Sequence, residues 1–239
     1  MKKLNVLITG ASSGIGSATV RALVCAGHNV MGMARRHELL EEIKLSLKDE
    51  SGSFEIFCGD VKSPSDIKNA VNQLTTLWGS LDTVIPNAGL GHFNPLDKGK
   101  LDEWHNMVDV NVTGVLNTLH ATIPHLLKSK GHVINIGSLA SRQVFKNSGV
   151  YCATKHFVLA ISESLRMEYS GQIAVTTINP GAVNTEFISH TTNDSLREEY
   201  VPNFASGMSP DFIAGAILEA SEAGGKGIFS EITLRPDRR

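Results

Sequence analysis

Residues 4–16 read LNVLITGASSGIG, an apolar run followed by a turn that holds three glycines, Gly10, Gly14 and Gly16. The run at residues 4–9 predicts a strand covered on both faces, because such strands lack polar alternation. A helical pattern continues to about residue 26. Glycines where a strand passes into a helix let the backbone approach a pyrophosphate at the helix N-terminus. A plain tight turn is the alternative, since the spacing is G-x-x-x-G-x-G rather than G-x-G-x-x-G.

Strand and helix patterns alternate along the rest of the chain. This alternation predicts an α/β fold: a single-domain Rossmann fold over residues 1–239, with a doubly wound, mostly parallel sheet and helices on both faces. Residues 184–208 show no clear period and are expected to form a long loop acting as a substrate-binding lid. The further strands are expected at residues 29–34, 53–58, 82–86, 132–137, 172–178 and 228–234. The further helices are expected at residues 38–48, 64–78, 101–130 with an interruption near Asn111 and Gly114, 151–169 and 210–223.

Composition excludes several classes of function. The chain has 239 residues, is 41% hydrophobic and carries a net charge of −2, which offers no electrostatic attraction to nucleic acid or to an anionic membrane. No apolar run approaches the roughly 20 residues of a membrane span. The run after the N-terminal lysines is too short for a secretory signal.

Three distant cysteines, Cys25, Cys58 and Cys152, suit a reducing compartment, so we expect a cytoplasmic protein. The histidines lack metal-ligand spacing, so no metal site is expected.

Ser138, Tyr151 and Lys155 form the candidate catalytic group. Ser138 follows the strand at residues 132–137, and Tyr151 and Lys155 lie on one face of the next helix. Lowering the pKa of a tyrosine by about three units requires roughly 4 kcal/mol, which an ammonium about 4 Å away supplies at an effective dielectric near 20. Tyr151 could then act as a general acid or base, while Ser138 holds the reacting oxygen. An exposed Tyr-Lys pair without function is the alternative.

Arg35 and Arg36 follow the strand at residues 29–34, where an acidic residue would bind the 2′-hydroxyl of NAD. Guanidinium groups instead suit a 2′-phosphate. We therefore expect NADP (NADPH) rather than NAD, with Arg35 as the main contact and a solvated helix start as the alternative for Arg36. Asp60 ends another strand and could bond an adenine amino group or cap the next helix.

Six motifs in order resemble those of the short-chain dehydrogenase/reductase family, in its compact single-domain branch. They are TGASSGIG at residues 9–16, NAG at residues 87–89, Asn111, Ser138, Tyr151-x-x-x-Lys155 and Pro180-Gly181. The resemblance covers nearly the whole chain. It implies a hydride transfer between NAD(P)(H) and a small alcohol or carbonyl substrate.

The resemblance also implies roles for individual residues. Tyr151 would exchange the proton and Ser138 would orient the substrate oxygen. Lys155 would bind the nicotinamide ribose and lower the pKa of Tyr151, and Asn111 would hold a water of a proton relay. Ser12 and Ser13 stand where many NADP-using members carry a basic residue, which leaves the NADP preference to Arg35. The other implied cofactor contacts are Gly10, Gly14, Ile15, Gly16, Asp60, Val61, Asn87, Ala88, Gly89, Pro180, Gly181, Val183 and Thr185.

The substrate is less well defined by the sequence. Arg142 could meet a substrate carboxylate or pair with an acidic residue of the lid such as Glu186. The chain end at residues 232–236 resembles the subgroup that acts on 3-hydroxy acids. Family members pair through helices matching residues 101–130 and 151–169, so the resemblance implies a homodimer or homotetramer. The expected lining of the substrate mouth is His92, Phe93, Leu139, Arg142, Gln143, Val144, Phe145, Phe187, His190 and Tyr200.

Two other functions compete with an NADP(H)-dependent oxidoreductase. A non-catalytic dinucleotide-binding redox sensor would be free to lose Tyr151 or Lys155, yet both are present. A sugar-nucleotide epimerase on a related scaffold would need a larger substrate domain than 239 residues can house.

Overall fold

Residues 2–224 and 227–238 of the computed structural model are described here, and they build a seven-stranded sheet in the order β3-β2-β1-β4-β5-β6-β7, with every neighbouring pair parallel. The chain moves outward from β1 to β3 and then returns to the other side of β1. The strands are β1 (Asn5–Thr9), β2 (Asn29–Ala34), β3 (Ser53–Cys58), β4 (Thr83–Ile85), β5 (His132–Ile136), β6 (Ala174–Pro180) and β7 (Glu231–Leu234).

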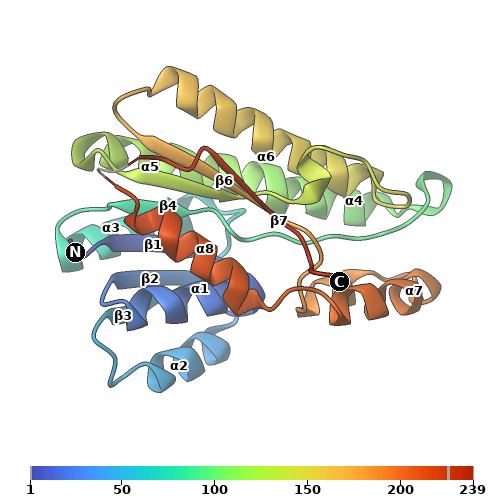
Figure 1. The fold of residues 1–239 in the computed structure, drawn as a ribbon, viewed down its shortest axis with the longest axis horizontal. Coiled ribbons are helices and arrows are strands. Elements are labelled where there is room, and N and C mark those ends of the chain that lie inside the picture. The colour runs from blue at the N-terminus through green and yellow to red at the C-terminus, as the bar shows by residue number, and fades with distance from the viewer. Residues whose placement is uncertain (1, 225–226, 239) are drawn as a thin grey trace.

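Helices cover both faces of the sheet (Figure 1). Alternate residues of β1 explain the two layers: Leu7 packs into the cluster with α3, α5 and α6, while Val6 and Ile8 pack into the cluster with α1, α2 and α8. The expected doubly wound fold is thereby confirmed. Within the described ranges the α-helices are α1 (Gly14–Cys25), α2 (His37–Ser46), α3 (Pro64–Trp78), α4 (Leu101–Val108), α5 (Gly114–Ser129), α6 (Gly149–Glu168), α7 (Asp194–Ala205) and α8 (Pro210–Glu222).

The interruption expected near Asn111 is a π-helical turn, Asp109–Thr113, between α4 and α5. Such turns insert an extra residue into a helix and often lie at functional sites. Gly114 follows directly, and a Cβ there would press against the side chain of Val61. The break therefore brings the helix close to the chain that follows β3.

Residues 184–208 were expected to form a long loop, and this prediction is wrong, because most of the segment is helical. A short 3-10 helix, Glu186–His190, is followed by α7, whose first turn is capped by the side chain of Asn193. Only Leu196 of α7 is fully buried, so the helix carries no apolar stripe for a periodicity search to find. Pro202 in its last turn further disguises it. This helix stands apart from the two layers that cover the sheet (Figure 1).

None of the helices in the described parts of the chain is long and apolar enough to cross a bilayer.

Candidate active site

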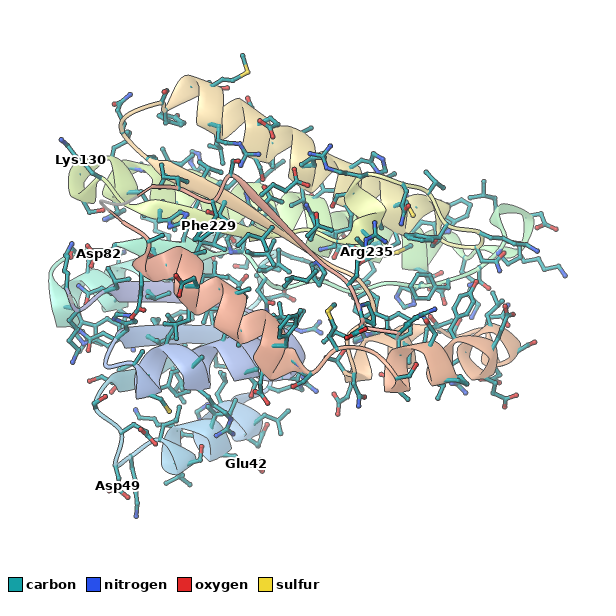
Figure 2. The ribbon with its side chains drawn as sticks, viewed as in Figure 1. Glu42, Asp49, Asp82, Lys130, Phe229 and Arg235 are labelled. Carbon is teal, nitrogen blue, oxygen red and sulfur yellow. The ribbon has the colours of Figure 1, made fainter. Side chains whose placement is uncertain are left out.

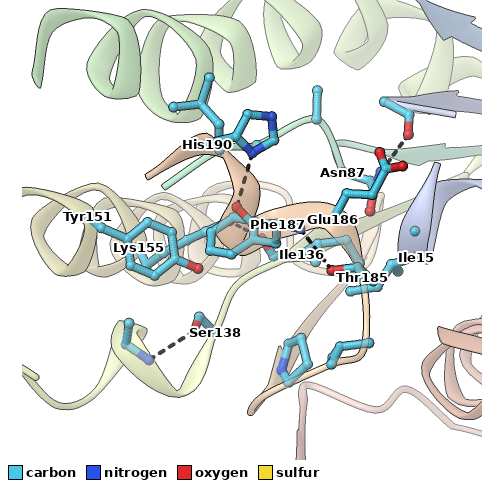
Figure 3. Close-up of a pocket in the computed structure, with 18 of the residues that line it drawn as sticks. Ile15, Asn87, Ile136, Ser138, Tyr151, Lys155, Thr185, Glu186, Phe187 and His190 are labelled. Atoms are coloured by element: carbon cyan, nitrogen blue, oxygen red, sulfur yellow. Dashed lines mark hydrogen bonds between the residues drawn. The ribbon is translucent and has the colours of Figure 1, made fainter. Parts of the chain in front are cut away.

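A cavity of about 1050 Å³ lies at the carboxyl ends of the strands, around the point where the chain order reverses at β1 and β4. Ligands of open α/β sheets bind in this place. Every residue of the expected cofactor contacts lines this cavity, as does Ser138, whereas Asn111 does not. Figure 3 draws side chains of residues that line this cavity.

The glycine turn forms one wall of the cavity. Gly10 and Gly14 have positive φ angles of 68° and 52°, and a Cβ on Gly16 would overlap the carbonyl oxygen of Gly10. Asn87 holds the turn from the next strand, since its Nδ2 donates to the carbonyls of Thr9 at 2.9 Å and of Gly10 at 3.2 Å. The turn is therefore rigid and closely packed.

The N-terminus of α1 opens from this turn toward the cavity lining. Ser13 is its N-cap residue but makes no side-chain capping bond, and the first turn holds no acidic residue. The backbone N–H groups of this end are thus left for an anion, and the helix dipole favours one. The free N–H donors and the helix dipole of this cradle suit a pyrophosphate.

Arg36 crosses the glycine turn. Its guanidinium donates to the hydroxyls of Ser12 at 3.3 Å and Ser13 at 2.5 Å, and it pairs with Glu186 at 3.4 Å. The backbone of Arg36 caps α2, but its side chain is not simply solvated, in contrast to the alternative considered for it. Arg35 also lines the cavity and is exposed. Both cations are therefore placed to meet a phosphate, and Arg36 is the better anchored.

Asp60 lies at the end of β3, and its carboxylate accepts a hydrogen bond from the backbone N–H of Lys62 at 3.0 Å. The next helix, α3, is capped instead by Ser63, whose hydroxyl accepts from the N–H of Asp66. The capping alternative for Asp60 is therefore wrong, and its carboxyl group remains part of the cavity wall.

Ser138 lies beyond the carboxyl end of β5, where its backbone is fixed by two side chains. Its N–H donates to Oγ of Ser141 at 3.0 Å and to Oδ1 of Asn179 at 3.2 Å, and its own Oγ accepts from the N–H of Ala140 at 3.1 Å. Tyr151 on α6 lines the same cavity, and its phenol oxygen lies on the side of Ser138 (Figure 3). Strand end and helix thus meet where the sequence predicts, as Figure 3 shows.

Burial controls the acidity of Tyr151 and Lys155, which are 9% and 7% exposed. It raises the pKa of Tyr151 to about 12, against the smaller effect of the Ser138 side chain, and it lowers the pKa of Lys155 to about 8. The Lys155 ammonium lies 6.0 Å from the Tyr151 ring centroid. The pKa of Tyr151 was expected to be lowered, but the groups of the protein alone raise it. The cost of burying the phenolate outweighs the attraction of the Lys155 ammonium.

The Asn111 side chain points away from the cavity lining and is buried. Its Oδ1 accepts from the N–H of Leu90 at 3.0 Å, and its Nδ2 donates to the Leu90 carbonyl at 2.8 Å and to Oγ1 of Thr154 at 3.0 Å. These bonds use both N–H groups of the amide and one of the two acceptor positions of Oδ1, so one acceptor position is left, and the water expected at Asn111 stays a prediction. It instead fixes the segment after β4 against α6.

Arg142 takes neither of the two roles considered for it. Its guanidinium forms a two-point ion pair with Glu231 of β7, and this partner holds the pKa of the Glu231 carboxyl below its usual range. Arg142 does not line the cavity. His92 and Val144 also lie outside it, whereas the other residues expected at the substrate mouth do line it.

An aromatic cluster surrounds Tyr151 at the substrate end. The Phe93 ring centroid lies 5.8 Å from that of Tyr151, and the Phe187 centroid lies 5.4 Å from it. Phe204 joins them from α7 at 6.0 Å from Phe187. Sequence reasoning missed Phe204 because α7 was expected to be a loop. It also missed Lys146, Asn203, Arg235 and Arg238, which come from a loop, from α7 and from the chain after β7.

The fold and this site define a dinucleotide-binding oxidoreductase with a Ser-Tyr-Lys group. Comparison with known proteins assigns it further: the model of the short chain dehydrogenase family matches residues 4–196, and the chain belongs to this family. An uncharacterised oxidoreductase of Staphylococcus saprophyticus is 38% identical over 97% of this chain and 95% of the relative. Serine 3-dehydrogenase of Agrobacterium fabrum is 36% identical over 89% of this chain and 85% of its own length.

Solved structures agree with this assignment. The closed form of serine dehydrogenase complexed with NADP+ has a TM-score of 0.89 and 31% identity, covering 97% of this chain and 94% of that one. An alcohol dehydrogenase from the archaeon Thermococcus sibiricus, complexed with 5-hydroxy-NADP, has a TM-score of 0.87 and 28% identity, covering 99% and 98%. The chain is therefore a family oxidoreductase that acts on alcohol or carbonyl groups with a nicotinamide cofactor.

Proposed function

We propose that the protein is an NADP(H)-dependent oxidoreductase that interconverts a small alcohol and its carbonyl compound, with Tyr151 as the general acid and base. The observation that carries the proposal is the meeting of Ser138, Tyr151 and Lys155 in the cavity that also holds the glycine turn. A nicotinamide dinucleotide, when bound, supplies the hydride donor or acceptor.

The protein's own groups handle the oxygen and the proton. In alcohol oxidation the substrate hydroxyl gives its proton to the Tyr151 oxygen, and in reduction the phenol returns it. Ser138 holds the same substrate oxygen through a hydrogen bond. Lys155, fixed by the carbonyl of Ile136 at 2.9 Å, contributes positive charge to the buried site and so favours the phenolate.

The preference for NADP is supported by Arg35 and Arg36. Two cations at the end of β2, with Arg36 held over Ser12 and Ser13, suit a 2′-phosphate better than a 2′-hydroxyl. The two structural relatives described above, which contain NADP+ and 5-hydroxy-NADP, support the same choice.

The substrate is a carbonyl compound with an apolar body and an anionic group. Phe93, Phe187 and Phe204 supply an apolar wall, while Lys146 and Arg238 line the same end of the cavity as the α7 residues Tyr200 and Asn203. The serine 3-dehydrogenases among the relatives, whose substrate carries a carboxylate, support the anionic group. Arg235 lies just beyond β7, on the side toward α7 (Figure 2).

A redox sensor that binds the dinucleotide without catalysis is the alternative. The test is the loss of NADPH absorbance with a panel of aldehydes, ketones, 3-oxo acids and diketones, with NADH in parallel. Turnover of one carbonyl class with NADPH supports the enzyme. Tight NADPH binding without turnover of any class supports the sensor. The cytoplasmic location and the homo-oligomer remain predictions, to be checked by cell fractionation and by light scattering.

A further inference from the structure

Glu103 of α4 is a buried carboxylate, 6% exposed, whose polar neighbours come from other parts of the chain. Its Oε1 accepts a short hydrogen bond from the hydroxyl of Thr192 and lies 3.7 Å from the ammonium of Lys100. Its Oε2 accepts from Nδ2 of Asn94 at 3.2 Å. The Nδ1 of His92 lies 4.0 Å from Oε1, beyond hydrogen-bond distance.

The network around Glu103 continues to the start of α7. Asn193 donates from Nδ2 to Oδ1 of Asn94 at 2.9 Å, and its own Oδ1 accepts from the N–H of Leu196 and so caps α7. Lys100 donates to the hydroxyl of Thr192 at 3.0 Å. Residues 184–208, the segment expected to act as the lid, are thereby tied to α4 at Thr192 and Asn193.

The same network positions the aromatic wall. Phe93 stands between His92 and Asn94, and its ring contacts Tyr151 at 5.8 Å and two lid residues, Tyr200 at 5.7 Å and Phe204 at 6.4 Å between centroids. A shift of Asn94 or of the lid would move these rings. The Glu103 network therefore contacts both chain segments that carry the aromatic wall, the segment of Phe93 and the lid.

The other polar side-chain ties of the lid are exposed or, where Nδ2 of Asn147 donates to the Tyr200 hydroxyl at 3.2 Å, half-buried. Glu186 and Arg36, which form one of them, have side chains that are 73% and 48% exposed, and exposed ion pairs contribute little. A buried carboxylate is different, because it loses hydrogen bonds without gaining full hydration when a partner leaves. The described lid is held most strongly at Thr192.

We propose that Glu103 is a positioning residue for the reaction: it anchors the lid through Thr192 and Asn193 and so sets the affinity for the carbonyl substrate. The expected effect on KM rests on the proposed function, whereas the anchoring of the lid by Glu103 does not. Glu103 does not line the cavity, so it acts through the lid and not on the reacting atoms. The glycine turn lies on other elements, and Thr185 is the one expected cofactor contact within the lid, so NADPH affinity is expected to change much less than KM.

The test compares Glu103→Gln and Thr192→Val with a matched control, Asp82→Asn. Asp82 is also a buried carboxylate, 5% exposed, but its partners are Lys2 and the N–H of Asn5, away from the lid. Four quantities are measured: kcat and KM for the best carbonyl substrate, the Kd for NADPH, and the rate of trypsin cleavage after Arg197 in α7, located by mass spectrometry.

Glu103→Gln is expected to raise KM about tenfold, the effect of losing a hydrogen bond to a charged group, with kcat nearly unchanged. Cleavage after Arg197 is expected to accelerate by a similar factor. Thr192→Val is expected to act in the same direction, which keeps the test valid if Glu103→Gln does not fold. Asp82→Asn is expected to lower Tm without either effect.

An unchanged KM and an unchanged cleavage rate in both lid variants would overturn the anchor, and so would equal effects in Asp82→Asn. If the wild-type protein turns over no carbonyl compound, the proposed function fails, but the cleavage comparison still decides whether Glu103 anchors the lid.

Discussion

The ammonium of Lys155 donates a hydrogen bond to the backbone carbonyl of Ile136, 2.9 Å away at the end of β5. This bond joins α6 to the strand that delivers Ser138, so the positive charge and the serine hydroxyl share one rigid support. The phenol of Tyr151 is one helical turn before Lys155. The catalytic group is thus assembled by the junction of one strand end with one helix.

Tyr151→Phe is expected to lower kcat by about 10²- to 10⁴-fold, the usual contribution of a general acid or base. The Kd for NADPH is expected to remain close to that of the wild type, because the ring and its packing are kept. Steady-state kinetics and a fluorescence titration measure the two quantities. Normal turnover by the variant would remove Tyr151 from the proposed chemistry.

Lys155→Ala is expected to change the pH dependence of alcohol oxidation. The pKa of Lys155 is about 8, so the group is charged at neutral pH, whereas burial raises the pKa of Tyr151 to about 12. Without the ammonium, phenolate forms only as the pH rises, so the loss is expected to be about 10²-fold or more near neutrality and smaller in alkali. The pH–rate profiles of both proteins provide the measurement. A loss independent of pH would contradict an electrostatic role.

Arg36→Asp is expected to weaken NADPH binding by about 10- to 100-fold, as for a lost hydrogen-bonded charge, with a much smaller effect on NADH. Arg35→Asp is expected to act in the same direction but less strongly, because Arg36 is the side chain fixed against Ser12 and Ser13. Titration of each variant with both dinucleotides tests this. Equal losses for NADPH and NADH would exclude a 2′-phosphate contact.

Arg238→Gln is expected to raise KM for carboxylate-bearing carbonyl substrates about tenfold and to leave KM for neutral ones unchanged. Arg142→Gln provides the comparison, because Arg142 is paired with Glu231 and lies outside the cavity. Kinetics on matched charged and neutral ketones measure the effect. If Arg142→Gln raised KM for charged ketones more than Arg238→Gln does, Arg142 rather than Arg238 would be the contact for the substrate carboxylate.

His132 makes stability depend on pH in the acid range. Burial lowers the pKa of His132 from 6.5 to about 4, and its Nε2 lies 2.8 Å from Oγ1 of Thr176. Between pH 6.5 and 4 the unfolded chain binds the additional proton, so the free energy of unfolding falls as the pH is lowered. The loss attributable to this group is about 3 kcal/mol by pH 4. Urea unfolding of wild type and His132→Gln checks it: the variant is expected to lose less stability over this window.

Local sequence patterns were sufficient to predict most helices and strands and the part of the site that faces the nucleotide. The strand at residues 4–9, the glycine turn and the Arg pair are contiguous features whose chemistry depends on neighbours in the chain. Tyr151 and Lys155 are likewise placed by helical spacing. The family resemblance then extended the site to Val61, the segment at residues 87–89 and the segment after β6.

Residues whose role depends on distant partners were harder to predict. Arg142 was considered for a substrate or for Glu186, but its partner Glu231 is brought beside it by the pairing of β6 with β7. Helix α7 was missed because its packing does not produce an apolar period. Glu103 has no local signal at all, since Thr192, its hydrogen-bond partner, lies 89 residues away in sequence.

The sequence by itself determined the class of fold, the glycine turn and the Ser-Tyr-Lys group, because these depend on short-range geometry: alternation, helical spacing and backbone freedom at glycine. The tertiary structure alone decided which arginine and lysine side chains line the cavity, which carboxylates are buried and which contacts hold the lid. Those properties depend on solvent exposure and on contacts between residues far apart in the chain, and burial changes the energy of a charge more than its neighbours in sequence do.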